Sequence, residues 1–179
     1  MLSGLKSGVF ISSAAEADWF MVLIRDSAAH IQTCMTGHTG DPVALVQHLM
    51  LAPVAAHAVQ EQEPDLGEQI RLTWTWLTAI AAARLLLHLH PDSDGLHLTP
   101  SGQLAHPFNI KSSKDGLIWA ETFAAADPRD SRMMDMNVAR IAGRLECHRY
   151  GFFMSPLFPG IERRPAFEHS GVQVWSLDI

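Results

Sequence analysis

The stretch LTWTWLTAIAAARLLLHL, residues 72–89, is apolar along most of its length and contains one charged residue, Arg84. Its apolar side chains cover a wide arc of a helix, and Glu63-Pro64-Asp65 provides a helix start, so a helix is predicted over 65–87 at the centre of the domain. The stretch reaches the length of a membrane span, but an arginine near the middle of a span costs about 2.5–3.5 kcal/mol. A buried core helix is therefore favoured, and no membrane partner is expected.

Two helices are predicted on the N-terminal side of this stretch. Ser13-Ala-Ala-Glu16 is a capping box, which starts a helix over 13–37. Asp41-Pro42 places an N-cap and a first-turn proline at the start of a second helix over 42–62.

Two further helices are predicted on the C-terminal side, over 117–126 and 130–149. The last carries an apolar stripe at helical spacing, formed by Met134, Val138, Ile141 and Leu145.

Alternation of leucine and histidine around Pro91-Asp-Ser-Asp-Gly95 predicts a β-hairpin, with a minor antiparallel element over about 87–106. Val172, Val174 and Trp175 predict a terminal strand that pairs with this hairpin or with Val9–Ile11. The predicted fold class is mainly α: a single helical domain over 1–179 with a small antiparallel sheet element. Residues 150–179, rich in proline and glycine, are predicted to pack on it as a C-terminal extension.

Composition narrows the classes of function. The 179 residues are 47% hydrophobic and carry a formal charge of −6, which excludes a disordered chain and does not favour a polyanionic partner. Two cysteines, Cys34 and Cys147, are too few for a disulfide-stapled secreted domain. The N-terminus lacks the continuous apolar run of a secretory signal. A cytoplasmic location without a cofactor is expected.

Ten histidines raise the question of metal binding. A Cys2His2 site would combine Cys34, His38, Cys147 and His148 from two helices. His88 and His90, two apart on a predicted strand, would face one side and offer a second pair of ligands. Neither set has the spacing of an established metal motif, so the protein is expected to fold without metal and with reduced cysteines.

Arginine is distributed asymmetrically, with seven of ten between Arg129 and Arg164. On the predicted last helix, Arg132, Arg140, Arg144 and His148 share one stripe. The proposed binding set is Arg132, Arg140, Arg144, His148, Arg149, Arg163 and Arg164. Guanidinium groups suit phosphates or an acidic protein surface, and the alternative is a solvated face with ion pairs to Asp135, Glu146 or Glu162. On this interpretation, replacing Arg140 and Arg144 with glutamine would leave stability nearly unchanged.

Three functions follow from these features. The first is a non-enzymatic helical interaction module, a small subunit or accessory factor of a larger assembly with a protein partner, because nucleophile elbows and phosphate loops are absent from the sequence. The second is a nucleic-acid-binding protein that uses the arginine stripe. The third is a metal-dependent enzyme that uses the histidine clusters.

Overall fold

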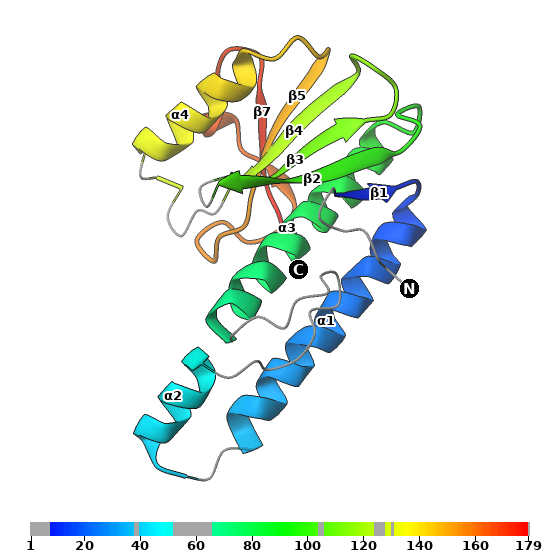
Figure 1. Ribbon diagram of the computed structural model, residues 1–179. Coiled ribbons are helices and arrows are strands. Elements are labelled where there is room, and N and C mark those ends of the chain that lie inside the picture. The colour runs from blue at the N-terminus through cyan, green and yellow to red at the C-terminus, as the bar shows by residue number, and fades with distance from the viewer. Residues whose placement is uncertain are drawn as a thin grey trace.

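The computed structural model describes residues 8–37, 40–51, 66–103, 106–123, 128–129 and 131–178. These residues form a seven-stranded mixed sheet with helices on both faces, with about 22% of residues in strands and 48% in helices (Figure 1). The protein therefore has an α/β fold, and the prediction of a mainly α domain with a minor hairpin is wrong.

The sheet has an antiparallel half and a parallel half. Strands β1 (Val9–Ile11), β2 (Leu96–Gln103), β3 (His106–Ser112) and β4 (Ile118–Phe123) pair antiparallel in chain order. Strands β5 (His148–Phe153) and β7 (Gln173–Ser176) then continue the sheet parallel to β4. The two-residue β6 (Glu162–Arg163) closes the far edge, next to the 3-10 turn η2 (Pro165–Phe167).

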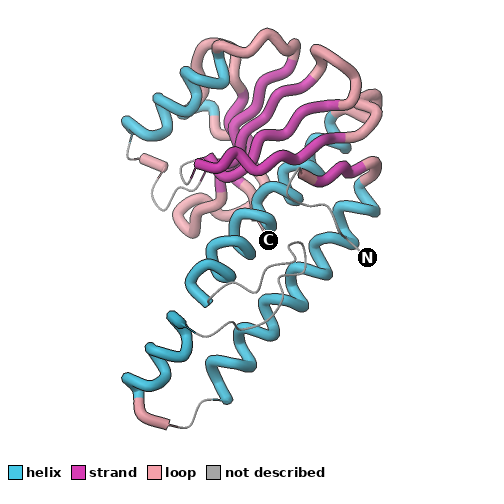
Figure 2. The backbone as a smooth tube through the Cα atoms, viewed as in Figure 1, coloured by secondary structure: helices cyan, strands magenta, loops and turns pink. Residues whose placement is uncertain are grey.

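The helix α3 (Leu66–Leu89) is the core helix that the sequence predicts. It packs on α1 (Ala14–Gly37) and across β2, β3, β4 and β5 (Figure 2). Trp76, Ile80 and Leu86 are fully buried, and alanines 79 and 81–83 let the neighbouring backbones approach closely. The helix is long and apolar enough to cross a bilayer, but 67% of its most apolar window is buried inside the fold, as in the core helix of a soluble protein.

The first helices start as predicted. In α1, the amide of Glu16 donates to Ser13 Oγ at 3.2 Å, while Glu16 accepts a bond from the Ser12 amide at 2.8 Å. In α2 (Pro42–Leu51), the amide of Ala44 donates to Asp41 Oδ2 at 3.1 Å. The continuation of this second helix to residue 62 lies outside the described residues.

Residues 118–123 and 148–149, predicted as helix, lie in strands at the middle of the sheet instead. Residues 118–123 are β4, and residues 148–153 are β5, so the last helix, α4 (Ser131–Ala142), ends seven positions before the predicted boundary at 149. Both strands carry buried side chains on both faces, so they lack the alternation that identifies a half-exposed strand. Met134, Val138 and Ile141 are buried as predicted, whereas Leu145 lies beyond α4 and is 99% exposed.

The predicted hairpin around residues 88–99 is also wrong. Leu87 and Leu89 belong to α3, and the leucines that follow, Leu96 and Leu98, pair with Ile11 and Val9 of β1. Gly95 lies directly before β2 and has a φ of +91°. A larger residue would not fit there, because its Cβ would lie 2.5 Å from the ring of Phe10. The terminal strand is confirmed as β7, but its neighbours are β5 and β6.

Two apolar cores result, one on each face of the sheet. The larger lies under α1 and α3 and includes Ile24, Leu98 and Phe152. The smaller lies under α4, which crosses from β4 to β5, and includes Val138 and Phe153. The predicted C-terminal extension is part of the sheet, because residues 150–178 contain β6, β7 and most of β5.

Candidate functional site

Arg140, in the predicted binding set, holds a buried carboxylate. It lies in the last turn of α4, and its guanidinium forms an ion pair with Glu121 of β4, whose side chain is 1% exposed. The indole Nε1 of Trp119 donates to the same carboxylate at 3.0 Å. This pair ties α4 to the sheet, so the geometry leads us to expect a loss of stability when Arg140 is replaced, in contrast to the small effect expected from the sequence.

Arg144 and Arg149 do not continue a helical stripe, because α4 ends at Ala142. Arg144 lies in the connection to β5, with its guanidinium carbon 3.8 Å from the centre of a Trp119 ring. Arg149 lies in β5 and donates from Nη1 to the carbonyl of Ala142 at 2.9 Å. It thereby satisfies a carbonyl at the end of α4 that has no partner within the helix.

Arg163 and Arg164 are bound at the β6 edge. Arg163 donates two hydrogen bonds to Glu168, each 2.8 Å long. Hydrogen bonding to Arg163 is the main reason why the pKa of Glu168 is below its usual value. Arg164 lies 2.8 Å from Glu162 and donates to Ser176 Oγ and to the Pro159 carbonyl at 3.0 Å. Both arginines fasten the segment before β7 to that strand.

The predicted binding set is therefore distributed over α4, a connection and two strands. Arg132 lies in α4, and His148 begins β5. The five remaining arginines each contact a carboxylate, a carbonyl or an aromatic ring of the same chain. Of the carboxylates predicted as partners, Glu162 does pair with Arg164.

The structure does not bring the predicted metal ligands together. Cys34 lies in the last turns of α1, at the far end of the molecule from the strands, whereas Cys147 and His148 lie at the start of β5 (Figure 1). His38 lies outside the described residues. His88 and His90 are not on a strand: His88 contacts the Arg84 carbonyl through Nδ1 at 2.9 Å, one turn back in α3. Within the described ranges, no three His, Cys, Asp or Glu side chains are arranged to hold a metal ion.

A histidine cluster that the sequence analysis did not predict joins α3 to β5. His90, the first residue after α3, lies with Nε2 2.6 Å from the hydroxyl of Tyr150, and its ring centre lies 4.4 Å from that of His148. Burial, and then the charge of His148, lower the pKa of His90, while burial raises the pKa of Tyr150. The contact spans 60 positions, so no sequence spacing indicates it.

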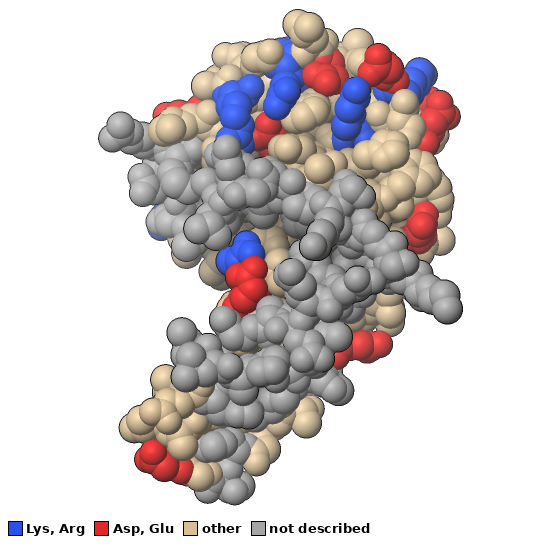
Figure 3. Space-filling view, viewed as in Figure 1, with Lys and Arg blue, Asp and Glu red and all other residues tan. Residues whose placement is uncertain are grey.

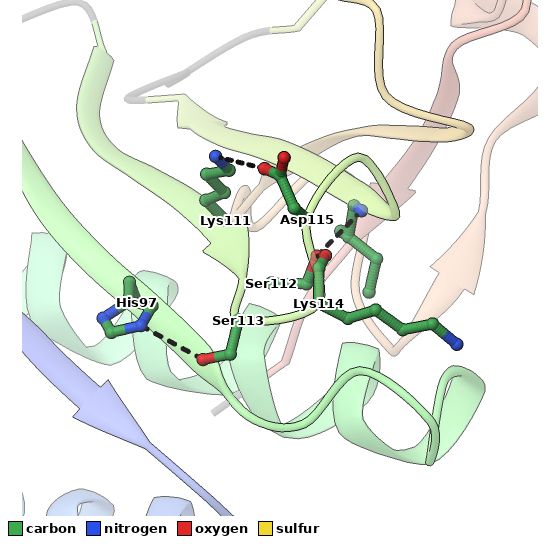
Figure 4. A network of polar contacts seen from close by, with 7 residues as sticks. His97, Lys111, Ser112, Ser113, Lys114 and Asp115 are labelled. Atoms are coloured by element: carbon green, nitrogen blue, oxygen red, sulfur yellow. Dashed lines mark hydrogen bonds and ion pairs between the residues drawn. The ribbon is translucent and has the colours of Figure 1, made fainter.

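The turn between β3 and β4 lies at the same end of the sheet (Figure 4). Lys111 pairs with Asp115 at 2.9 Å, and His97 contacts Ser113 Oγ at 3.1 Å. Lys114 reaches back to Asp92, after α3, at 2.8 Å. These charges are balanced within the turn, so they leave no concentrated basic patch.

One cleft of about 380 Å³ lies between α1 and α3 and is also lined by Ile161 and Asp178. The charged residues that line this cleft include both acidic and basic side chains. Arg84 Nε lies 2.6 Å from Asp18 Oδ1 across it, so the two helices neutralise each other there.

Several exposed apolar side chains lie on a helical arm, which we define as α2, residues 25–37 of α1 and residues 66–75 of α3. The arm extends away from the sheet (Figures 1 and 2). Five large apolar side chains on it are 42–62% exposed: Met35, Val43, Val46, Ile70 and Trp74. On the face seen in Figure 3, charged side chains gather over the sheet, whereas the described surface at the end of the arm is mostly uncharged.

The sequence predicts these helices but does not locate this surface. Helix α2, PVALVQHLML, has no charged residue, and an apolar helix is normally covered on at least one face. The arm therefore combines an uncharged helix with exposed apolar side chains. No family model matches this chain, and neither a curated protein nor a solved structure matches it.

Proposed function

We propose that this protein is a non-enzymatic interaction module that docks a protein partner through its helical arm, as a small subunit or accessory factor of a larger assembly. The observation that carries the proposal is the exposure of Val43 and Val46 on α2, at 62% and 59%. These two side chains are three apart, so they share one face of the helix.

The chemistry of the arm specifies the kind of partner. Trp74, 42% exposed, is an aromatic anchor of the type that dominates binding energy at protein interfaces. On α3, the charged residues of the arm, Glu68 and Arg71, form an ion pair with each other. An apolar protein surface therefore complements the arm better than a polyanion does.

The arginine set supports the proposal indirectly. A phosphate backbone is bound by guanidinium groups that are free to replace counterions. Here Arg140, Arg163 and Arg164 are paired with carboxylates of the chain itself. No specific observation therefore favours nucleic-acid binding. The same holds for a metal-dependent enzyme, because His88 and His97 make local contacts with Arg84 and Ser113.

The proposal includes a cytoplasmic location. The exposed thiol of Cys147 is free, which suits a reducing compartment.

The test compares two variants of the tagged protein, each with two exposed apolar side chains replaced by glutamate. Val43→Glu with Val46→Glu alters the arm, while Met136→Glu with Leu145→Glu alters exposed positions on α4 and after it, at 63% and 99% exposure. Proteins that co-purify with each are identified and their affinity measured. The arm variant should weaken binding at least about tenfold, and the control should bind as the wild type does.

Circular dichroism checks that each variant is folded. All four positions are exposed, so each variant should keep its helix content. A partner that binds the arm variant and the wild type equally would overturn the proposal. Equal loss in both variants would also overturn it, because binding would then depend on apolar surface in general. The native mass of the purified protein shows whether the partner is a second copy of the chain.

A further inference from the structure

We propose that His90, His148 and Tyr150 form an acid-sensitive latch that holds the C-terminal end of α3 on β5 while the imidazoles are neutral and loosens when both are protonated. The proposal is independent of the helical arm, which lies at the other end of α3. It rests first on where the three side chains lie.

The contact joins two elements that are distant in the chain. His90 follows the last turn of α3, and its amide donates to the Leu86 carbonyl at 2.8 Å. Its ring Nε2 lies 2.6 Å from Tyr150 Oη, and Tyr150 is 3% exposed and stacked on Phe152 of the larger core. The orientation of the His90 ring is therefore coupled to the packing of α3 on the sheet.

The two imidazoles cannot both be charged without a cost. Their ring centres are 4.4 Å apart, and His90 is partly withdrawn from water. Like charges at this distance repel each other, and burial disfavours the charged form of His90. The cluster is therefore more compatible with the folded state when the two rings do not both carry a charge.

The groups that face the cluster from neighbouring elements do not remove this cost. Asp92, in the turn after α3, raises the pKa of His90, but burial and His148 lower it by more. Its carboxylate is held by Lys114 from the β3–β4 turn, at 2.8 Å. From β6, Arg163 adds a positive charge that acts on Tyr150. At His90, burial and His148 together therefore outweigh the attraction of Asp92 for a proton.

The direction of the pH effect follows from the pKa of His90, which is lowered in the folded chain. The unfolded chain then binds a proton more readily than the folded chain does. Stability is lost as the pH falls from the unfolded value, about 6.5, towards the lower folded value, and it is not regained below that.

The test is a proton NMR titration of the histidine rings and backbone amides between about pH 8 and pH 5, the range in which histidine changes charge. The His90 ring should titrate below its ordinary value, and the amides of His90 and Tyr150 should shift with the same midpoint. In His148→Gln the midpoint of His90 should rise, because the second charge is gone. His88→Gln is the matched control, since His88 is two residues away and its ring lies 2.9 Å from the Arg84 carbonyl, and the change should leave the midpoint unchanged.

Thermal unfolding gives a second measurement on the same proteins. The wild type should lose more stability on acidification than His90→Gln does. A wild-type His90 that titrates at or above about 6.5 would overturn the proposal, as would a midpoint that His148→Gln does not move. If His148→Gln does not fold, the wild-type midpoint and the shared shift of the His90 and Tyr150 amides decide the question.

Discussion

Replacing Arg140 with glutamine removes the cationic partner of a carboxylate that water does not reach. Glu121 is 1% exposed, and among the described residues its other hydrogen bond comes from Trp119 Nε1 at 3.0 Å. Breaking a buried ion pair from one side costs about 3–5 kcal/mol, because a charge stays buried without compensation. Since Arg140 is 35% exposed, water can reach part of the gap, and we expect a cost nearer about 2–3 kcal/mol.

The cost is measured by chemical denaturation of Arg140→Gln, with Glu121→Gln and the double variant completing a mutant cycle. For a protein of this size the single change should lower the Tm by about 4–12 °C. The double variant should be less destabilised than the two single changes combined, by about 1–3 kcal/mol, because neither partner is left as an isolated charge.

Arg144→Gln is the matched control. It removes an arginine close to Arg140 in sequence that stacks on the exposed side of Trp119, and an exposed cation–π contact contributes about 0.5–1 kcal/mol. If Arg140→Gln is within about 0.5 kcal/mol of the wild type, Arg140 behaves as an ordinary surface residue and the reasoning is refuted.

Two further changes test the packing and the β6 edge. Gly151→Ala in β5 would place a Cβ 2.7 Å from the Phe123 ring, so we expect a loss of about 1–3 kcal/mol in the free energy of unfolding. Gly37→Ala, whose Cβ meets nothing within 4 Å, should lose nothing, and equal effects of the two would contradict the packing argument. Glu168→Gln should destabilise by about 1 kcal/mol at neutral pH, because the charged form accepts two bonds from Arg163. The pKa of Glu168 is lowered in the folded chain, so its contribution is present above 4.5 and is lost as the pH falls through the folded value; a difference between wild type and variant that stays constant in acid would contradict this.

Local signals in the sequence were sufficient for several elements. The wide apolar arc of residues 72–89 correctly identified the core helix, since a helix covered on nearly all sides must be apolar on nearly all sides. The capping box at Ser13 and the aspartate at Asp41 correctly marked two helix starts, because a cap is made by residues three or four apart.

The sheet could not be recognised by the same means. β4 and β5 are short and have buried side chains on both faces, so they show no period-two pattern and resemble part of a buried helix until their neighbours are known. Here the neighbours are α3 on one face and α4 on the other, and α4 comes between the two strands in the chain.

The sequence by itself determined where α1 and α2 start, which residues of α4 are buried and that the C-terminus ends in a strand. Only the tertiary structure decided the role of the polar residues. Glu121 and Arg140 are 19 positions apart, and His90 and Tyr150 are 60 apart, so their partnerships depend on how the sheet is ordered. Local sequence fixes the backbone through contacts within a few residues, whereas the charge and hydrogen bonds of a buried side chain depend on whatever the fold places opposite it.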